Sequence, residues 1–273
     1  MNYGIANKIG KVLDNEIEAI LNLAWSKGID TLDTAKAYGD SEKKIGEYLI
    51  GKPESNWNII TKISTNGITL SNQIKDSVAK LTRNPTIIMA HSAELFINKQ
   101  FQNELANAKE RQIISRVGVS LYNKDEIYQV LKSLIKPDVI QIPMNILDTR
   151  LYRNRTLSQL HNKGIEIHIR SAFLQGLFYL PKEMLDKSFS DAMPYLEKLE
   201  AIATESGLTL AELSLLWLIS LEEVNKVIIG IDNAKQLQNH IQTLNKNVDA
   251  SVFKKALSIH YDNENVLNPS QWD

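Results

Sequence analysis

Short apolar runs alternate with amphipathic segments along the whole chain. Seven of these runs are rich in Ile and Val and lack a strict alternation of apolar and polar positions. This pattern is typical of strands that are covered on both faces in a parallel sheet. The predicted strands are residues 29–34, 58–62, 87–91, 116–121, 139–143, 166–171 and 226–230. The pattern therefore predicts an α/β protein.

The segments between the strands carry helix signals. Residues that commonly cap helix N-termini precede the amphipathic stretches, namely Asp14, Ser71, Asn123 and Thr209, the last with Glu212 three positions on. Glycines stand where helices would end, at Gly28, Gly164 and Gly207. No Pro/Gly-rich linker divides the chain. We therefore expect one (β/α)8 TIM-type barrel domain spanning residues 1–273.

The strand count is one short of a closed barrel, which has eight strands. The first helix pattern begins close to Met1, so the absent strand would have to lie before Met1. We therefore expect a barrel that is missing or incomplete at its first strand. Residues 1–8 contain a glycine and two asparagines and are a poor substitute strand. Unpaired strand edges favour association, so we expect a monomer or a weak homo-oligomer.

Reactive side chains fall at the ends of three consecutive predicted strands. Asp33 ends the first of them, and Tyr38 follows five residues later in the loop Asp-Thr-Ala-Lys-Ala-Tyr-Gly-Asp-Ser-Glu. Lys62 and His91 end the next two strands. In such barrels the loops at the carboxyl ends of the strands carry the chemistry. An acid, a phenol, an amine and an imidazole in these positions indicate proton transfer to a carbonyl oxygen.

These positions resemble the aldo-keto reductase family, from about Tyr3 to the C-terminal helix. The resemblance implies an oxidoreductase that reduces an aldehyde or ketone, with sugar-derived compounds among the options, by hydride transfer from a nicotinamide cofactor. Tyr38 would be the general acid, with Asp33, Lys62 and His91 as the other catalytic residues.

The residues implied to bind the cofactor form three groups. Ser120 and Gln141 would hold the nicotinamide amide, and Arg170 would lie beside the loop over the pyrophosphate, which contains Ser171, Phe173, Gln175 and Gly176. Gly230, Asn233, Gln236 and Asn239 would meet the adenosine ribose and its phosphate.

The resemblance implies NADP as the cofactor, with NAD as the alternative. Arg170 stands where an aromatic residue often stacks on the nicotinamide, and a guanidinium plane can also stack on a ring. Residues 230–240 lack a clear set of Lys and Arg that would clamp a 2′-phosphate. We therefore expect only a weak preference for NADP.

Composition limits the other classes of function. The chain has no cysteine and a net charge of −1, so thiolate chemistry is excluded and nothing favours a nucleic-acid partner. No apolar run reaches the ~18–20 residues that span a bilayer. No cluster of His with carboxylates suggests a metal. We therefore expect a cytoplasmic protein with a small-molecule carbonyl substrate and no membrane or metal partner.

Two other interpretations remain open. Lys62 inside a barrel could serve as the amine nucleophile of a Schiff-base lyase or aldolase. The chain could also be a non-catalytic nicotinamide-binding or regulatory barrel, because a strand is missing. Near the middle of the chain, Arg150, Arg153 and Arg155 fit a solvated helix start, with an acidic-substrate site as the alternative.

Overall fold

Seven strands follow one another in chain order through the computed structural model, which describes residues 10–64 and 67–272. They are β1 Thr31–Asp33, β2 Asn58–Ile63, β3 Ile87–Ala90, β4 Arg116–Ser120, β5 Val139–Pro143, β6 Glu166–Arg170 and β7 Lys226–Val227. Adjacent strands pair in parallel. All seven predicted strands are confirmed, each to within three residues at either end. The strand predicted before Met1 and the expectation for residues 1–8 lie outside the described residues.

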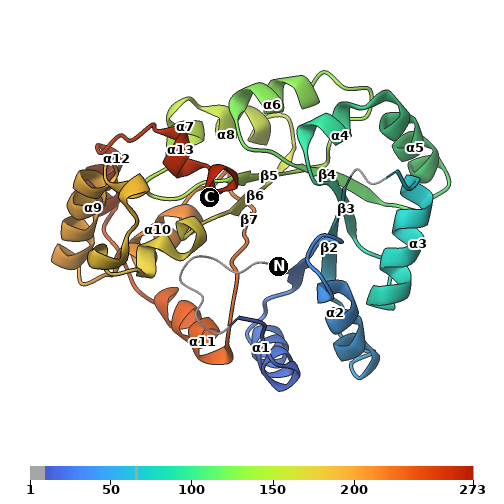
Figure 1. Ribbon diagram of the computed structural model, residues 1–273, viewed down its shortest axis with the longest axis horizontal. Coiled ribbons are helices and arrows are strands. Elements are labelled where there is room, and N and C mark those ends of the chain that lie inside the picture. Colours follow the sequence, from blue (N-terminus) through green and yellow to red (C-terminus); the bar gives the residue numbers. More distant parts are fainter. Residues whose placement is uncertain (1–9, 65–66, 273) are drawn as a thin grey trace. The chain divides into compact units, whose positions relative to one another are not determined.

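The chain divides into two compact units, one from Val12 to Gln141 and the other from Ile142 onward with residues 10 and 11. The first holds β1 to β4 and the start of β5 (Figure 1). Its helices are α1 Asp14–Ser26, α2 Ser41–Ile50, α3 Leu70–Leu81, α4 Ala93–Ile97, α5 Lys99–Glu110 and α6 Lys124–Val130. That the two units form one domain stays a prediction.

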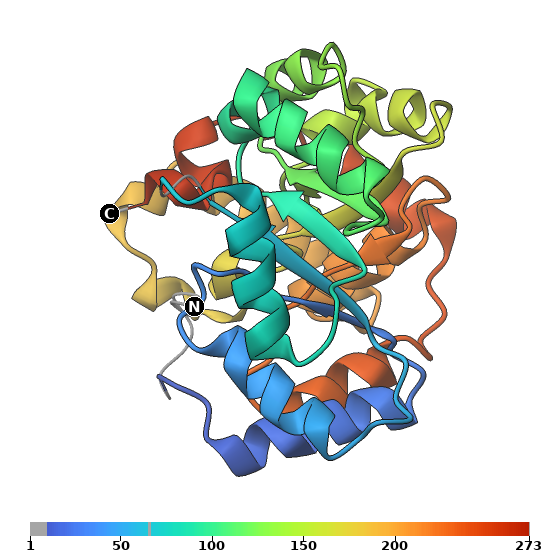
Figure 2. The same cartoon turned by 90° about the vertical axis from the view of Figure 1, so that its right-hand side faces the viewer.

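Tight helix packing supports the strands of the first unit. Helices α2 and α3 lie side by side, as Figure 2 shows in light blue and teal. Gly46 makes this close approach possible, because a Cβ atom there would lie 1.9 Å from the carbonyl oxygen of Lys80. Apolar side chains of the neighbouring strands form a buried core cluster of Ile60, Ile87, Met89 and Val139. The strand ends of this unit therefore rest on a closely packed base.

The second unit holds the end of β5, then β6 and β7. The backbone N–H of Met144 donates to Arg170 O at 3.1 Å, and that of Ile228 donates to Ile169 O at 2.7 Å. Its α-helices are α7 Arg150–Arg153, α8 Thr156–His161, α9 Met193–Glu205, α10 Leu210–Ile219, α11 Ala234–Thr243, α12 Ala250–Leu257 and α13 Glu264–Leu267. Its 3-10 helices are η1 Leu174–Tyr179, η2 Lys182–Met184, η3 Lys187–Phe189 and η4 Pro269–Gln271.

Two of the four predicted helix caps are confirmed. Asn123 caps α6, and Thr209 forms a capping box with Glu212 at the start of α10. The prediction for Asp14 is wrong, because α1 already includes it and is preceded by Leu13, which makes no side-chain cap. The prediction for Ser71 is wrong as well. Thr69 caps α3 instead, since the buried Leu70 is part of the helix.

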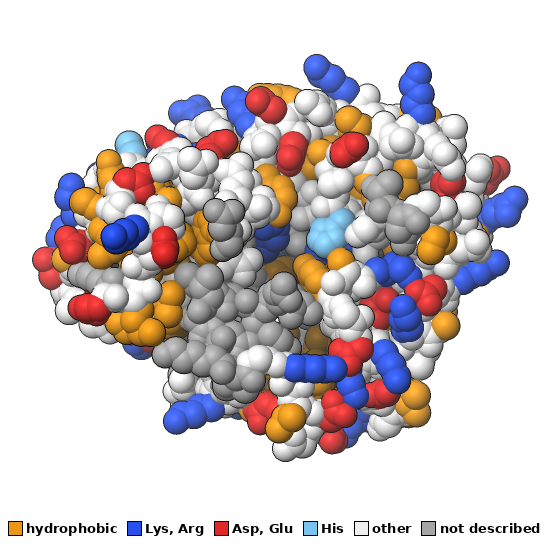
Figure 3. All heavy atoms as spheres, viewed as in Figure 1, with side chains coloured by type: hydrophobic (Ala, Val, Ile, Leu, Met, Phe, Trp, Pro, Cys, Tyr) orange, Lys and Arg blue, Asp and Glu red, His pale blue; other side chains and the backbone are white. Residues whose placement is uncertain are grey.

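Charges of both signs are present on the surface. On the face seen in Figure 3, Lys and Arg side chains are interspersed with Asp and Glu among the side chains coloured by type. Within the described ranges no three His, Asp or Glu side chains are grouped to hold a metal ion. No single described helix is long and apolar enough to cross a membrane. Taken together, α9 and α10 have the length and composition of a span, but they are bent by 81° relative to one another.

Candidate active site

A buried ion pair joins the ends of β1 and β2. The Lys62 ammonium donates to Oδ1 of Asp33, and these two side chains are 1% and 9% exposed. Lys62 Nζ also donates to the carbonyl oxygen of Thr34 at 3.3 Å. A buried ammonium is tolerated when it is paired and hydrogen-bonded. The two strands therefore hold a fixed charge pair at the ends where chemistry was predicted.

Gln141 completes the surroundings of Asp33. Its Nε2 donates to Asp33 Oδ2 at 2.8 Å, so both oxygens of this carboxylate accept hydrogen bonds. The Gln141 side chain is 1% exposed. Ser120, at the end of β4 and 4% exposed, is the register partner of Gln141. The two residues predicted to hold the nicotinamide amide thus lie on adjacent strands, and one of them contacts the Asp33–Lys62 pair.

Tyr38 and His91 lie close to the same pair. Lys62 Nζ is 5.2 Å from the centroid of the Tyr38 ring. The rings of Tyr38 and His91 are 6.0 Å apart between centroids and meet edge to face at 78°. His91 Nδ1 is also 3.4 Å from Ser64 Oγ, a contact that the sequence did not indicate. The four predicted catalytic residues are therefore gathered in one place in the first unit.

Backbone hydrogen bonds fix the loop that carries Tyr38. The Lys36 N–H donates to Lys62 O at 3.1 Å, so the loop continues the pairing of β1 with β2. The Tyr38 N–H then donates to Ala35 O at 3.0 Å and closes a turn. These bonds limit the positions available to the phenol ring.

The predicted pyrophosphate loop of the second unit has an unusual backbone. Four of its residues have positive φ angles, which are Ser171 at 60°, Leu174 at 46°, Gln175 at 54° and Gly176 at 90°. Three of these are not glycine, and such conformations cost energy for residues with a Cβ atom. Turns of this kind can direct backbone N–H groups at an anion.

Phe173 brings this loop into contact with helix α11. Its ring stacks on that of His240 with a centroid distance of 4.9 Å and an interplanar angle of 11°. Burial lowers the pKa of His240, and the nearby charge of Glu212 acts in the opposite direction. His240 Nε2 is buried without a hydrogen-bond partner in the described part of the chain. The stack joins the two segments of this unit that were predicted to bind the cofactor.

Several predicted cofactor residues also have structural roles. Asn233 caps α11 by accepting from the Gln236 N–H at 2.8 Å, and Gln236 Oε1 accepts from the Asp232 N–H at 2.8 Å. The carbonyl oxygen of Asn239 accepts from Thr243 Oγ1 at 3.0 Å. Gly230 is exposed beyond the end of β7. The contacts of Asn233, Gln236 and Asn239 order helix α11. That these residues bind a ligand stays a prediction.

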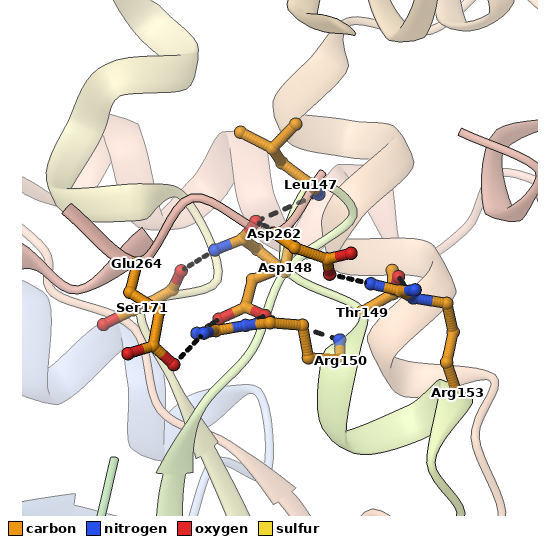
Figure 4. A network of polar contacts seen from close by, with 9 residues as sticks. Leu147, Asp148, Thr149, Arg150, Arg153, Ser171, Asp262 and Glu264 are labelled. Carbon is orange, nitrogen blue, oxygen red and sulfur yellow. Dashed lines mark hydrogen bonds and ion pairs between the residues drawn. The ribbon is translucent and has the colours of Figure 1, made fainter. Parts of the chain in front are cut away.

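A polar network that the sequence did not predict lies at the ends of β5 and β6. Arg150 bonds to both carboxylate oxygens of Asp148, at 2.8 and 3.0 Å, and to Glu264 at 2.7 Å (Figure 4). Arg153 pairs with Asp262 in the same view. These two arginines do lie in a short helix that starts at Arg150, but their side chains are only 20% and 27% exposed and are paired with carboxylates, so they are not simply solvated. Asp148 is close to Arg150 in the sequence, but Glu264 and Asp262 are too distant for local patterns to reveal.

Asn145 links this network to the predicted cofactor loop. Its Nδ2 donates to Ser171 O at 3.2 Å, while its Oδ1 accepts from the N–H groups of Leu147 and Asp148 at 3.0 and 2.9 Å. Asn145 is 1% exposed. A polar residue two positions after a predicted strand was the only signal that sequence offered.

Comparison with known proteins defines the class of protein that has this fold. A solved aldo-keto reductase from Bacillus halodurans, in its holo form, is similar with a TM-score of 0.76 and 19% identity. The match covers 96% of this chain and 92% of that chain. The predicted fold class is confirmed as an α/β barrel of the (β/α)8 type, of which the described residues contribute seven strands.

The sequence comparisons give the family. The model of the aldo/keto reductase family matches residues 1–260. The chain belongs to this family of oxidoreductases, which confirms the resemblance in the sequence. L-glyceraldehyde 3-phosphate reductases of Escherichia coli O157:H7 and of strain K12 are each 26% identical over 164 residues, covering 52% of this chain. The chain spans about half, 47%, of the length of these curated relatives.

Proposed function

We propose that this protein reduces an aldehyde or ketone to an alcohol with a nicotinamide cofactor, and that Tyr38 is the general acid. The observation that carries the proposal is the buried Lys62–Asp33 pair, with Lys62 Nζ 5.2 Å from the Tyr38 ring centroid. A fixed positive charge beside a phenol stabilises the negative charge that forms as the phenol releases its proton.

Each residue has a distinct task in this reaction. Asp33 orients the Lys62 ammonium through the ion pair. His91, whose ring is 6.0 Å from that of Tyr38, orients the substrate carbonyl oxygen by hydrogen bonding. Tyr38 donates its proton to that oxygen as the carbon is reduced. The cofactor supplies the hydride.

The residues around the pair suit a nicotinamide. Ser120 and Gln141 present a hydroxyl and an amide side by side, which can hydrogen-bond a carboxamide. In the second unit, the positive-φ loop that includes Ser171, Gln175 and Gly176 is suited to a pyrophosphate. Arg170, Phe173, Gly230, Asn233, Gln236 and Asn239 are proposed as the remaining cofactor residues.

The substrate is proposed to be a small carbonyl compound, with sugar-derived aldehydes and ketones as the first to test. The curated relatives named above are reductases of a phosphorylated three-carbon aldehyde. The ion pair makes Lys62 a poor Schiff-base nucleophile, because a protonated amine has no free electron pair.

Replacing Tyr38 by Phe tests the acid directly. We expect Tyr38→Phe to keep cofactor affinity and to lower kcat by at least ~10²-fold, since the proton donor is lost and the ring remains. Tyr48→Phe is the matched control. It removes a hydroxyl from helix α2 that bonds to Asn22 at 3.0 Å, and it should keep full turnover. A Tyr38→Phe protein with near wild-type carbonyl reduction would refute the assignment.

The cofactor preference can be measured by titration with NADPH and NADH at low salt, using tryptophan fluorescence. We expect NADPH to bind only modestly more tightly, because residues 230–240 offer Lys235 as their one lysine and no arginine. A bidentate arginine clamp on the 2′-phosphate would give stronger discrimination. A preference above ~1,000-fold, about 4 kcal/mol, would contradict this expectation.

A further inference from the structure

Gln141 makes a hydrogen bond within the protein that a residue which only binds the cofactor would not need. Its amide donates to Asp33, the residue that holds Lys62. We propose that Gln141 is a positioning residue that couples occupation of the nicotinamide site to the Asp33–Lys62 pair. The proposal rests on the proposed function, since it concerns the same site.

The chemistry of the contact fixes the orientation of the Gln141 amide. An ionised carboxylate only accepts hydrogen bonds. The atom of Gln141 that lies 2.8 Å from Asp33 Oδ2 must therefore be the NH2 nitrogen. This leaves the carbonyl Oε1 of Gln141 as the group available to a ligand. An acceptor in that place matches the NH2 group of a carboxamide.

The two hydrogen bonds of Gln141 reinforce one another. When Oε1 accepts a hydrogen bond, the amide becomes more polarised and Nε2 becomes a better donor to the carboxylate. Asp33 Oδ2 is then held more firmly, and Oδ1 keeps its direction toward Lys62. A charge-assisted hydrogen bond is among the stronger ones, so its loss should loosen the pair.

Ser120 provides a matched comparison. It lies opposite Gln141 in the register of β4 and β5, and it is proposed to bind the same carboxamide. Ser120 and Asp33 share no hydrogen bond in the described part of the chain. Experiment can therefore separate the two roles, with Ser120 as a residue that only binds the cofactor and Gln141 as one that also positions the Asp33–Lys62 pair.

The first experiment compares Gln141→Met with Ser120→Ala. Both should raise the Kd of the nicotinamide cofactor about tenfold, as expected for one lost hydrogen bond of ~1.4 kcal/mol. At saturating cofactor, only Gln141→Met should also lower kcat and shift its pH profile, because only this change releases Asp33. If Gln141→Met leaves the pH profile in place and behaves as Ser120→Ala does, Gln141 is only a cofactor ligand and the proposal is wrong.

The second experiment uses the cofactor-free protein and does not depend on activity. Gln141→Met is made in the wild type and in a background that carries Asp33→Leu with Lys62→Met, and unfolding in urea is measured. An apolar replacement of a buried ion pair often keeps the fold. Gln141→Met should lower the folding equilibrium constant at least tenfold in the wild type. In the second background it should leave that constant unchanged or raise it.

The outcomes separate this proposal from the proposed function. An equal loss of stability in both backgrounds would show that Gln141 does not act through Asp33, and would overturn the proposal. If the wild type reduces no carbonyl compound, the proposed function fails. The unfolding measurements still decide whether Gln141 holds Asp33.

Discussion

The two units of this chain hold their proposed functional residues in different ways. In the first unit, side chains at strand ends bond to one another, as in the buried contacts of Asp33 with Lys62 and Gln141. In the second unit, the proposed cofactor loop relies on its backbone, with positive φ angles at Ser171 and Gln175. Proton transfer requires fixed charges, which rigid strands provide. Binding of a long anionic ligand can use the N–H groups of a loop.

The contrast extends to exposure. Lys62 is 1% exposed, whereas Gln175 lies at the surface. A change in the first unit should therefore cost both stability and turnover. A change at Gln175 should act mainly on local conformation.

Removing the buried ammonium should have the largest effect. Lys62→Met leaves the Asp33 carboxylate buried without its cation, which should lower the free energy of unfolding by about 3–5 kcal/mol and kcat by more than ~10²-fold. Urea unfolding and carbonyl reduction measure the two effects. Lys80→Met is the control, because Lys80 and its partner Asp76 are 44% and 48% exposed and an exposed pair contributes only ~0–1 kcal/mol. Similar losses for the two variants would contradict the role of burial.

His240 should make the stability of the second unit depend on pH. Its pKa is lowered by burial, with the Glu212 charge opposing, so the unfolded chain takes up this proton more readily than the folded protein does. The free energy of unfolding should fall as the pH drops below ~6.5, the ordinary value for histidine. His240→Phe, which can still stack on Phe173, should remove this part of the pH dependence.

The measurement for His240 is urea unfolding at pH 5.5 and at pH 7.5. The exposed His161 serves as the control, and His161→Gln should keep the wild-type difference between the two pH values. The effect should be smaller than that of Lys62→Met. A His240→Phe protein with an unchanged difference would show that this histidine does not set the pH response.

The smallest effect is expected from relieving backbone strain. Gln175 has a φ of 54°, a region that glycine adopts without steric cost. Gln175→Gly should therefore change the free energy of unfolding by between zero and about 1 kcal/mol in the stabilising direction. Gln159→Gly, in helix α8, should destabilise by roughly 0.5–1 kcal/mol. Equal destabilisation by both changes would show that the φ at Gln175 is not strained.

The sequence predicted those features that depend on local pattern. The short apolar runs located all seven described strands, and the ends of these runs indicated Asp33, Lys62 and His91. Helix starts were less certain, because Thr69 and Ser71 both offer hydroxyls and only the burial of Leu70 decides between them. Local pattern cannot show which residue will be buried and so become the first residue of a helix.

Contacts between distant residues could not be predicted in the same way. Gln141 and Asp33 are 108 positions apart, and each has a plausible role without the other. The pairing of strands in the order β1 to β5 brings their ends to the same edge of the first unit. Only the folded structure shows that the Gln141 amide, predicted to bind a cofactor, also bonds to the carboxylate of Asp33, which is predicted to be catalytic.

The arginine network has a consequence for the order of folding. Arg150 and Glu264 are 114 positions apart, and Arg153 and Asp262 are 109 apart, whereas Asn145 and Ser171 are separated by 26. Contacts across longer stretches of chain carry a higher loop-closure entropy and form more slowly. The hydrogen bond from Asn145 to Ser171 should therefore form before Arg150 and Arg153 pair with the segment 262–264. During synthesis, the ends of β5 and β6 would be ordered first, and the acidic segment would dock onto a surface that is already in place.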